Sequence, residues 1–253
     1  FRAAAAKKFT WKRNTEQAAR RAQIITKDAI LNFEMQEATN SAEYRAAASV
    51  RAASFYTYPA DRSEFAARSH RRMKLDAEWE AIENKVSGTD TAWSSVQVSC
   101  LLATISLPPN AAADVLALAE GLDPTCKLPA DGMSPPKLVV GTLDVNVGER
   151  IPAEELMGTL PKDCVSGKRA YLSNVCVASS ARRNGIAMQL VKAANTFAFG
   201  KGVEMMYVHV ADDNPGAYNL YTGAGFVVEA EESTKDAHAL CRARRYLLRS
   251  ELS

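Results

Sequence analysis

Along the chain, stretches that alternate apolar and polar residues give way to stretches whose apolar residues return every three or four positions. Alternation predicts β-strands, and the wider spacing predicts helices. Strands are predicted over 29–37, 96–107, 138–147, 204–210, 226–231 and 242–249. Helices are predicted over 43–54, 61–86, 111–121 and 214–222. The pattern therefore predicts an α/β fold.

The second predicted helix shows its buried face directly. Leu75, Trp79, Ile82 and Val86 fall at positions i, i+4, i+7 and i+11, so they lie on one side of the helix and are expected in the core.

The last predicted strand carries Arg242, Arg244 and Arg245, which we expect to be edge charges that discourage pairing between sheets.

Two segments interrupt the predicted sheet. Residues 108–136 are rich in proline, and we expect an insertion in the form of a loop carrying one helix. Residues 148–168 form a second loop with Glu154, Glu155 and Asp163, and loops of this length are often functional. These acids could meet a substrate amine, or they could form a solvated acidic loop.

Composition limits the class of protein. The chain has 253 residues, 47% of them hydrophobic, which is ample for a packed core, and we expect one domain over 24–253. No apolar run approaches the roughly 20 residues of a membrane helix, so a soluble protein is expected. The five cysteines are scattered without metal-ligand spacing, which favours reduced thiols and no metal site.

The basic residues gather at the start of the chain. The net charge is only +2, yet the first 22 residues hold seven Lys or Arg and one acid, Glu16. Residues 1–23 therefore resemble the end of an organelle transit peptide. A solvated basic helix is the main alternative. A nucleic-acid-binding arm is less favoured, because only Phe9 and Trp11 could stack on bases.

The segment 173–187 carries the first chemical signal. An apolar strand ending at Val177 runs through small residues into a helix start with Arg182, Arg183, Asn184 and Gly185. Free N–H groups and the helix dipole favour an anion there, and glycine lets a phosphate approach closely. The segment predicts a pyrophosphate site.

A second motif follows the next strand. Asn214-x-x-Ala217-x-x-Leu220-Tyr221-x-x-x-Gly225-Phe226 comes after Val175-x-Val177 and Arg182-x-x-Gly185-x-Ala187. In this order and spacing, the elements resemble the Gcn5-related N-acetyltransferases (GNAT superfamily) over roughly residues 137 to 248. The whole chain is most similar to the plastid N-terminal and lysine acetyltransferases of plants and algae.

The resemblance implies a fold and a co-substrate. The fold is a mixed, mostly antiparallel sheet with a splayed parallel strand pair, flanked by helices, and acetyl-CoA binds along the splayed strand. The implied coenzyme-binding residues are Val175, Cys176, Val177, Arg182, Arg183, Asn184, Gly185, Ile186, Ala187, Asn214 and Tyr221. No metal is implied.

Two residues are predicted to be catalytic. The family usually places a tyrosine at the position of Tyr221, where a phenol with a pKa of about 10 can protonate the leaving thiolate. Some N-terminal acetyltransferases of the superfamily place a histidine where His209 lies, on the strand beside the coenzyme. Alternation puts His209 on the face of Met205 and Tyr207, so it is either the base or a buried structural histidine.

The substrate follows from amine chemistry. At pH 7 an α-amine is roughly 14% neutral and a lysine about 0.04%, so a weak base suffices only for the α-amine. We therefore predict transfer of acetyl groups to protein N-termini, with lysines as further substrates, in the chloroplast stroma. The alternatives are a small-amine acetyltransferase and a non-catalytic acyl-CoA-binding subunit that docks in a larger assembly through its basic arm.

Overall fold

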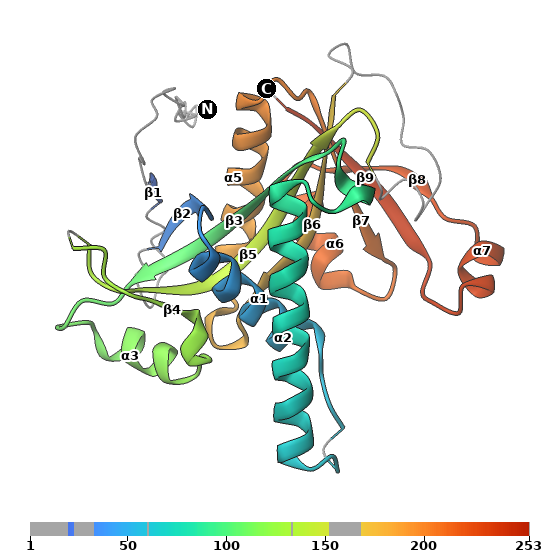
Figure 1. The fold of residues 1–253 in the computed structure, drawn as a ribbon. Helices are drawn as coiled ribbons and strands as arrows, with labels where there is room; N and C mark the ends of the chain where they lie inside the picture. Colours follow the sequence, from blue (N-terminus) through green and yellow to red (C-terminus); the bar gives the residue numbers. More distant parts are fainter. Residues whose placement is uncertain (1–19, 23–32, 60, 133, 152–167, 253) are drawn as a thin grey trace, which may run out of the picture.

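The sheet organises the molecule. The computed structural model describes the backbone of residues 20–22 and, in full, residues 33–59, 61–132, 134–151 and 168–252. Within these ranges one nine-stranded sheet has the order β1-β2-β3-β5-β6-β7-β9-β8, with β4 paired to β5 (Figure 1). Its strands are β1 (Arg20–Ala22), β2 (Phe33–Glu37), β3 (Gln97–Ser106), β4 (Lys127–Leu128), β5 (Lys137–Gly148), β6 (Arg169–Val177), β7 (Met205–Ala211), β8 (Val227–Glu231) and β9 (Arg245–Glu251).

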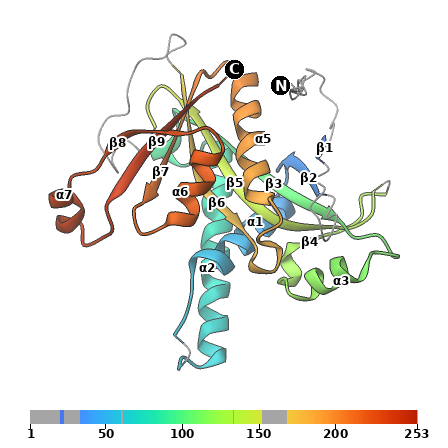
Figure 2. The ribbon, with the colours of Figure 1, turned by 180° about the vertical axis from the view of Figure 1, so that it is seen from behind.

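Helices cover both faces of the sheet. They are α1 (Ser41–Phe55), α2 (Glu64–Ser87), α3 (Ala113–Glu120), α5 (Ile186–Gly200), α6 (Pro215–Gly223) and α7 (Thr234–Ala239). α1 and α2 lie on the face toward the viewer in Figure 1, and α5 and α6 lie on the opposite face, as Figure 2 shows. α5 packs closely on β5, because a Cβ on Gly141 would lie 3.0 Å from Leu190 Cδ1. This layering confirms the predicted fold class.

One pair of neighbouring strands differs from the others. β6 and β7 are parallel, whereas every other pairing within the described sheet is antiparallel. The parallel pairing spans only Arg169–Tyr171 against Met205–Tyr207, although both strands continue beyond it. The splayed parallel pair is therefore present, and the two strands diverge after Tyr171.

Helix α2 confirms its predicted face. Leu75 and Ile82 are buried, and Trp79 and Val86 pack against the core from partly buried positions. Its N-terminal half projects past the sheet (Figure 1), where Phe65 is 80% exposed. The helix begins after Ser63, whose hydroxyl accepts a hydrogen bond from the N–H of Ala66 at 3.2 Å.

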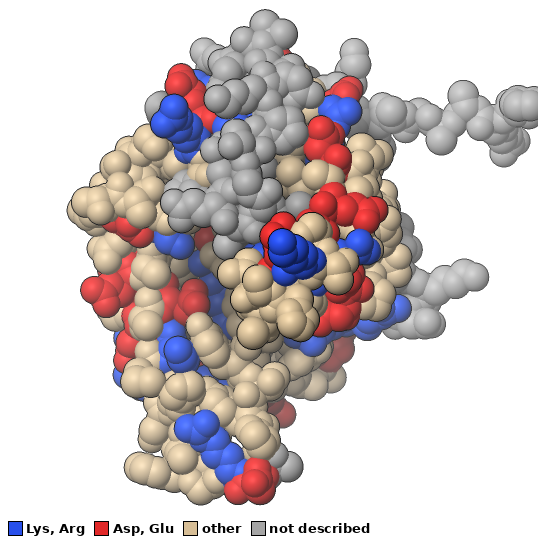
Figure 3. All heavy atoms as spheres, turned by 90° about the vertical axis from the view of Figure 1, so that its right-hand side faces the viewer, with Lys and Arg blue, Asp and Glu red and all other residues tan. Residues whose placement is uncertain are grey.

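The prediction that the arginines near the last strand are charges at a sheet edge was wrong. β9 lies between β7 and β8, so β8 forms the edge, and β9 begins only at Arg245. Arg242 precedes the strand and binds the carboxylate of Glu232 at 2.5 and 2.6 Å. Arg244 lies 3.2 Å from Glu231. Arg242 and Arg244 therefore serve local ion pairs. Acidic and basic side chains are interspersed on this side of the molecule (Figure 3).

Other predicted elements need smaller corrections. The insertion contains the expected helix, α3, and also the short β4. Helix α7 was not predicted, although Ser233 caps it by accepting from the N–H of Asp236 at 3.1 Å, and a serine followed three residues later by an acid is a known start signal. Residues 1–19, 29–32 and the acids at 154, 155 and 163 lie outside the described residues, and the division into domains stays a prediction.

Candidate active site

The divergence of β6 from β7 creates the central feature of the site. Alternate main-chain groups of a strand point to opposite edges, and the β7-facing groups of β6 after Tyr171 have no partner in β7. Val175 and Val177 lie in this free segment. Unpaired strand groups offer hydrogen bonds to an extended ligand in the same way as a neighbouring strand would.

A bulge accompanies the divergence. Thr142 pairs with Cys176 and Asp144 with Ser173, so two residues of β6 face the single residue between them on β5. One of the two, Asn174, has a φ of 56°, in the left-handed region that asparagine tolerates better than most residues. A bulge bends its strand and increases the twist. It therefore explains why β6 leaves β7 here.

The start of α5 provides an anion site beside the free edge. Gly185 precedes the helix with a φ of 72°, and no side chain caps it. The first N–H groups, from Gly185 through Ala187, donate to no acceptor within the described part of the chain. Together with the helix dipole, they attract an anion such as a phosphate.

Two of the three polar side chains around this helix start form local hydrogen bonds, and their contact with a coenzyme stays a prediction. Arg182 Nε donates to the carbonyl of Val177 at 3.1 Å, so this residue ties the end of β6 to the helix. Asn184 Nδ2 donates to the carbonyls of Ala181 and Arg182, each at 3.2 Å, and therefore shapes the turn. Arg183, exposed and with a φ of 69°, makes no such bond in the described residues.

His209 has a partner that the sequence did not indicate. Tyr171 Oη and His209 Nδ1 are 2.9 Å apart across the β6–β7 pair. His209 shares a face with Met205 and Tyr207, as predicted, and this face also carries Tyr171 and Leu247. Its Nε2 is buried and has no hydrogen-bond partner among the described residues. Neither the partner strand of β6 nor the register of the parallel pair can be derived from local alternation, so Tyr171 was missed.

Burial changes the acid–base behaviour of this pair. Burial, assisted by the charge of Arg245, lowers the pKa of His209 to about 4. Burial also raises the pKa of Tyr171 to about 12. Both groups are therefore neutral at pH 7, when His209 can accept a proton and Tyr171 can donate one.

Tyr221 lies on α6 and is 5% exposed. Its ring packs against Phe226 with 5.7 Å between centroids. Burial, with smaller contributions from Tyr171 and Cys176, raises the pKa of Tyr221 above its ordinary value. The hydroxyl stays protonated at neutral pH, as a proton donor must. Two nearby tyrosines are also packed: Tyr207 is fully buried, and the ring of Tyr218 contacts that of Tyr246.

Asn214 caps helix α6. Its Oδ1 accepts a hydrogen bond from the N–H of Ala217 at 3.0 Å, and Pro215 occupies the first helical position. Capping alone accounts for the asparagine. A contact with the coenzyme stays a prediction.

A buried ion pair supports the bulge from α1. Arg51 is 1% exposed, and its Nη2 lies 2.5 Å from Asp144 Oδ1 on β5. The other carboxylate oxygen of Asp144 accepts from Asn174 Nδ2 at 2.8 Å. Burial disfavours the charge of Arg51, but Asp144, together with Cys100 and Cys176, outweighs this effect and raises the pKa of the guanidinium. A chain of polar contacts therefore runs from α1 through β5 to β6.

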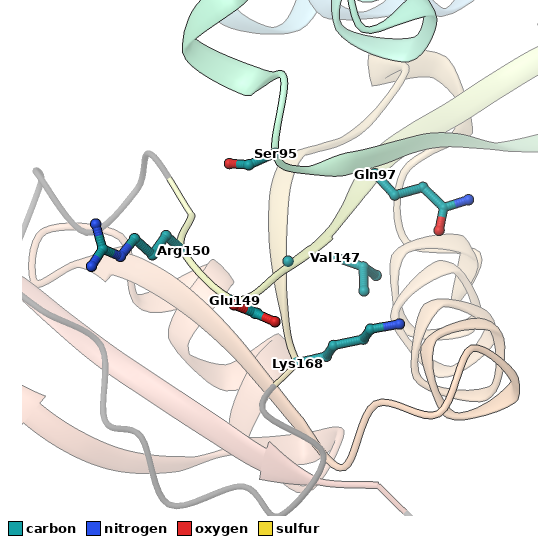
Figure 4. A pocket seen from close by; sticks show the side chains of 7 residues that line it. Ser95, Gln97, Val147, Glu149, Arg150 and Lys168 are labelled. Carbon is teal, nitrogen blue, oxygen red and sulfur yellow. The ribbon is translucent and has the colours of Figure 1, made fainter.

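A separate cavity of about 460 Å³ lies where β5 ends and β6 begins (Figure 4). Lys168 and Gln97 extend to the same side of it, whereas Arg150 points away. The cavity precedes the parallel pair on β6, while the free edge follows that pair. It is therefore distinct from the site built around Tyr171 and His209.

The described residues offer neither a metal site nor a membrane-spanning helix. They contain no group of three or more metal-ligating side chains, and none of their helices is long and apolar enough to cross a membrane. Cys100, Cys126, Cys176 and Cys241 are free thiols. Burial raises the pKa of Cys176 to about 12, so its thiol is not a nucleophile at neutral pH.

Comparison with known proteins places this geometry in context. The profile of the acetyltransferase (GNAT) family matches residues 137–226. The chain is 35% identical over 217 residues to "GCN5-related N-acetyltransferase 7, chloroplastic" of Arabidopsis thaliana, which covers 85% of this chain and 75% of that protein. It is 40% identical over 100 residues to "GCN5-related N-acetyltransferase 6, chloroplastic" of the same plant, over 36% of this chain and 35% of that protein.

A solved structure shares the fold. The crystal structure of an acetyltransferase of the GNAT family from Desulfovibrio desulfuricans superposes with a TM-score of 0.50 at 12% identity, over 87% of this chain and 99% of that one. At this identity the similarity concerns the fold alone.

Proposed function

Because the chain belongs to the GNAT family of acetyltransferases and uses acetyl-CoA as co-substrate, we propose that it acetylates protein amino groups, above all N-terminal α-amines. The observation that carries the proposal is the pair Tyr171–His209, which lies where β6 and β7 diverge and is neutral at pH 7. Lysine side chains are the second substrate in this proposal.

The coenzyme would bind along the free edge of β6. Main-chain groups of Val175 and Val177 would bond the pantetheine arm, and one of them would polarise the thioester carbonyl. The pyrophosphate would lie at the start of α5, against the N–H groups of Gly185, Ile186 and Ala187. Arg183 would add positive charge from an exposed position.

The amine would lose its proton to the Tyr171–His209 pair. With the proton of the imidazole on the buried Nε2, the Tyr171 oxygen would accept the amine proton and pass its own to His209 Nδ1. The 2.9 Å distance between Tyr171 Oη and His209 Nδ1 fits this transfer. Tyr221 would then protonate the departing thiolate of the coenzyme, since it retains its proton at neutral pH.

The strength of this base favours α-amines. A group with a pKa of about 4 is a poor proton acceptor from a lysine ammonium, whose ordinary pKa is about 10.4. An α-amine, with an ordinary pKa of about 7.8, is already partly neutral at pH 7 and needs only the removal of a proton during attack. The lowered pKa of His209 therefore supports the N-terminal substrate over lysine.

We place the proposed activity in the chloroplast stroma. The two Arabidopsis relatives are named as chloroplastic, and residues 1–23 have the basic, acid-poor composition of the end of a transit peptide. Protein or peptide substrates are the proposed partners. A larger assembly formed through the basic arm is a further expectation from the sequence.

Mass spectrometry of acetylated peptides tests the proposal. Three peptides that differ only in their amines would be compared: one with a free N-terminus and no lysine, one with a blocked N-terminus and one lysine, and one with neither amine. We expect acetyl-CoA-dependent modification of the first, slower modification of the second and none of the third. Modification of small amines alone, or binding of acetyl-CoA without turnover, would contradict the proposal.

A further inference from the structure

The bulge in β6 requires an unusual backbone conformation at a residue that is not glycine. Asn174 has a φ of 56°, and it is one of two residues of β6 that face a single residue of β5. Glycine is the usual residue at such a position because it has no Cβ. Asparagine tolerates this conformation better than most residues, and unlike glycine it has a side chain that can form hydrogen bonds.

In the structure, the side chain of Asn174 connects the bulge to helix α1 on one face of the sheet. Asn174 Nδ2 donates to Asp144 Oδ2 at 2.8 Å, and Asp144 Oδ1 is paired with Nη2 of the fully buried Arg51 at 2.5 Å. The same Nη2 lies 3.4 Å from Thr142 Oγ1. Arg51 belongs to α1, so the bulge is attached through two side chains to a helix that packs on β3, β5 and β6.

The position of the link matches the place where the strands diverge. Pairing with β7 ends at Tyr171, and the bulge formed by Asn174 and Val175 begins three residues later, just before the end of β6 at Val177. A small change in the direction of β6 at this point would shift every main-chain group on its free edge. The chain of contacts is rigid, since a buried guanidinium paired with a carboxylate has few alternative positions.

We propose that Asn174 is a positioning residue whose side chain, anchored by Asp144 and Arg51, holds the free edge of β6 in the geometry that binds acetyl-CoA. The inference rests on the proposed placement of the coenzyme along β6. Asn174 itself would not contact the substrate; it would act through the main chain of Val175 and Val177.

Replacement by glycine separates the two roles of the residue. Asn174→Gly keeps the left-handed conformation and removes the link to Asp144. Asn174→Asp keeps the size of the side chain but places a carboxylate against a carboxylate. Cys241→Gly is the matched control, because Cys241 also has a positive φ (50°) and lies exposed in the turn before β9.

Calorimetry with acetyl-CoA and steady-state kinetics with a peptide provide the measurements. We expect both Asn174 variants to bind acetyl-CoA about tenfold more weakly, the scale of one lost hydrogen bond, with KM for the peptide within about twofold of the parent protein. The control should match the parent in both. Thermal melting should show that the glycine variant remains folded.

The outcomes are distinguishable from a failure of the proposed function. Unchanged acetyl-CoA affinity in Asn174→Gly, in a protein whose affinity falls when Gly185 is replaced, would overturn the positioning role and leave the proposed site intact. Unchanged affinity in both would instead contradict the coenzyme placement. A peptide KM that rises as much as the acetyl-CoA dissociation constant would also overturn the proposal, because it would indicate general disruption.

Discussion

At the scale of the residue, the hydroxyl of Tyr221 is the proposed proton donor to the leaving thiolate. Tyr221→Phe removes this oxygen and leaves the buried ring against Phe226. We expect kcat to fall about 10²-fold or more, the usual size of a general-acid effect, while acetyl-CoA affinity stays within a few-fold. Single-turnover rates and calorimetry measure the two quantities. Tyr218→Phe is the control, and a larger loss there than at Tyr221 would transfer the acid role to Tyr218.

Replacement of His209 should affect the two substrates differently, because a lysine side chain needs more assistance in losing its proton than an N-terminal α-amine. Deprotonating a lysine at pH 7 costs roughly 3.5 kcal/mol more than deprotonating an α-amine. His209→Gln should therefore slow lysine acetylation more than N-terminal acetylation, and Tyr171→Phe, which removes the partner of Nδ1, should do the same. Rates on both peptides are compared with saturating coenzyme. Equal losses on both would indicate that His209 only positions the substrate, and no loss would make it structural.

The buried imidazole also predicts how acid affects stability. In the folded protein the pKa of His209 is about 4, against about 6.5 for an ordinary histidine. Between these pH values the unfolded chain binds a proton that the folded chain does not. The neutral His209 therefore does not lower the free energy of unfolding above pH 6.5, and that free energy falls as the pH decreases from 6.5 toward 4. The loss amounts to at most about 3 kcal/mol.

Urea unfolding at pH 7, 5.5 and 4 measures this effect. As the pH falls, the parent protein should lose more unfolding free energy than the His209→Gln variant, because glutamine does not titrate. A difference that is the same at all three pH values would mean that His209 titrates normally in the folded protein.

At the scale of the element, the start of α5 depends on a glycine in the left-handed region. Gly185 has a φ of 72°, which a residue with a Cβ adopts at a cost of about 1–2 kcal/mol. Gly185→Ala should therefore lower stability and also weaken acetyl-CoA binding, because the N–H groups at this turn are the proposed phosphate ligands. Gly185→Trp should abolish binding.

A second glycine allows the cost of backbone strain to be measured separately from the effect on acetyl-CoA binding. Gly202 follows the end of α5 with a φ of 78°, and a Cβ there would meet no atom within 4 Å. Gly202→Ala should therefore cost similar stability without affecting acetyl-CoA. Calorimetry and thermal melting of the two alanine variants provide the comparison. Unchanged affinity in a folded Gly185→Trp variant would show that the phosphates bind elsewhere.

At the scale of the whole molecule, acetyl-CoA should stabilise the fold, since its proposed site joins β6 to the start of α5. A ligand present at 100 times its dissociation constant adds about 2.7 kcal/mol to the free energy of unfolding. For a chain of this size, that corresponds to a rise in Tm of about 5–10 °C. Thermal melting with and without acetyl-CoA measures the shift. The Gly185→Trp variant should show none, and an equal rise in that variant would contradict the assigned site.

Much of the fold was determined by the sequence alone, because periodicity is a local property. Alternation located β3, β5 and β7, and the stripe from Leu75 to Val86 located the buried side of α2. It also placed His209 on the face of Met205 and Tyr207. The glycine before α5 and the asparagine before α6 marked both helix starts, since the chemistry of a cap depends on a few neighbouring residues.

Only the tertiary structure decided which strands are neighbours and how far they pair. The order of β7, β9 and β8 makes β9 an internal strand, which overturned the predicted edge charges. The three-residue pairing of β6 with β7 brought Tyr171 to His209, and the packing of α1 on β5 brought Arg51 to Asp144 and Asn174. Such contacts join residues up to 93 positions apart, and their formation depends on the packing of the entire sheet and its helices rather than on any local pattern.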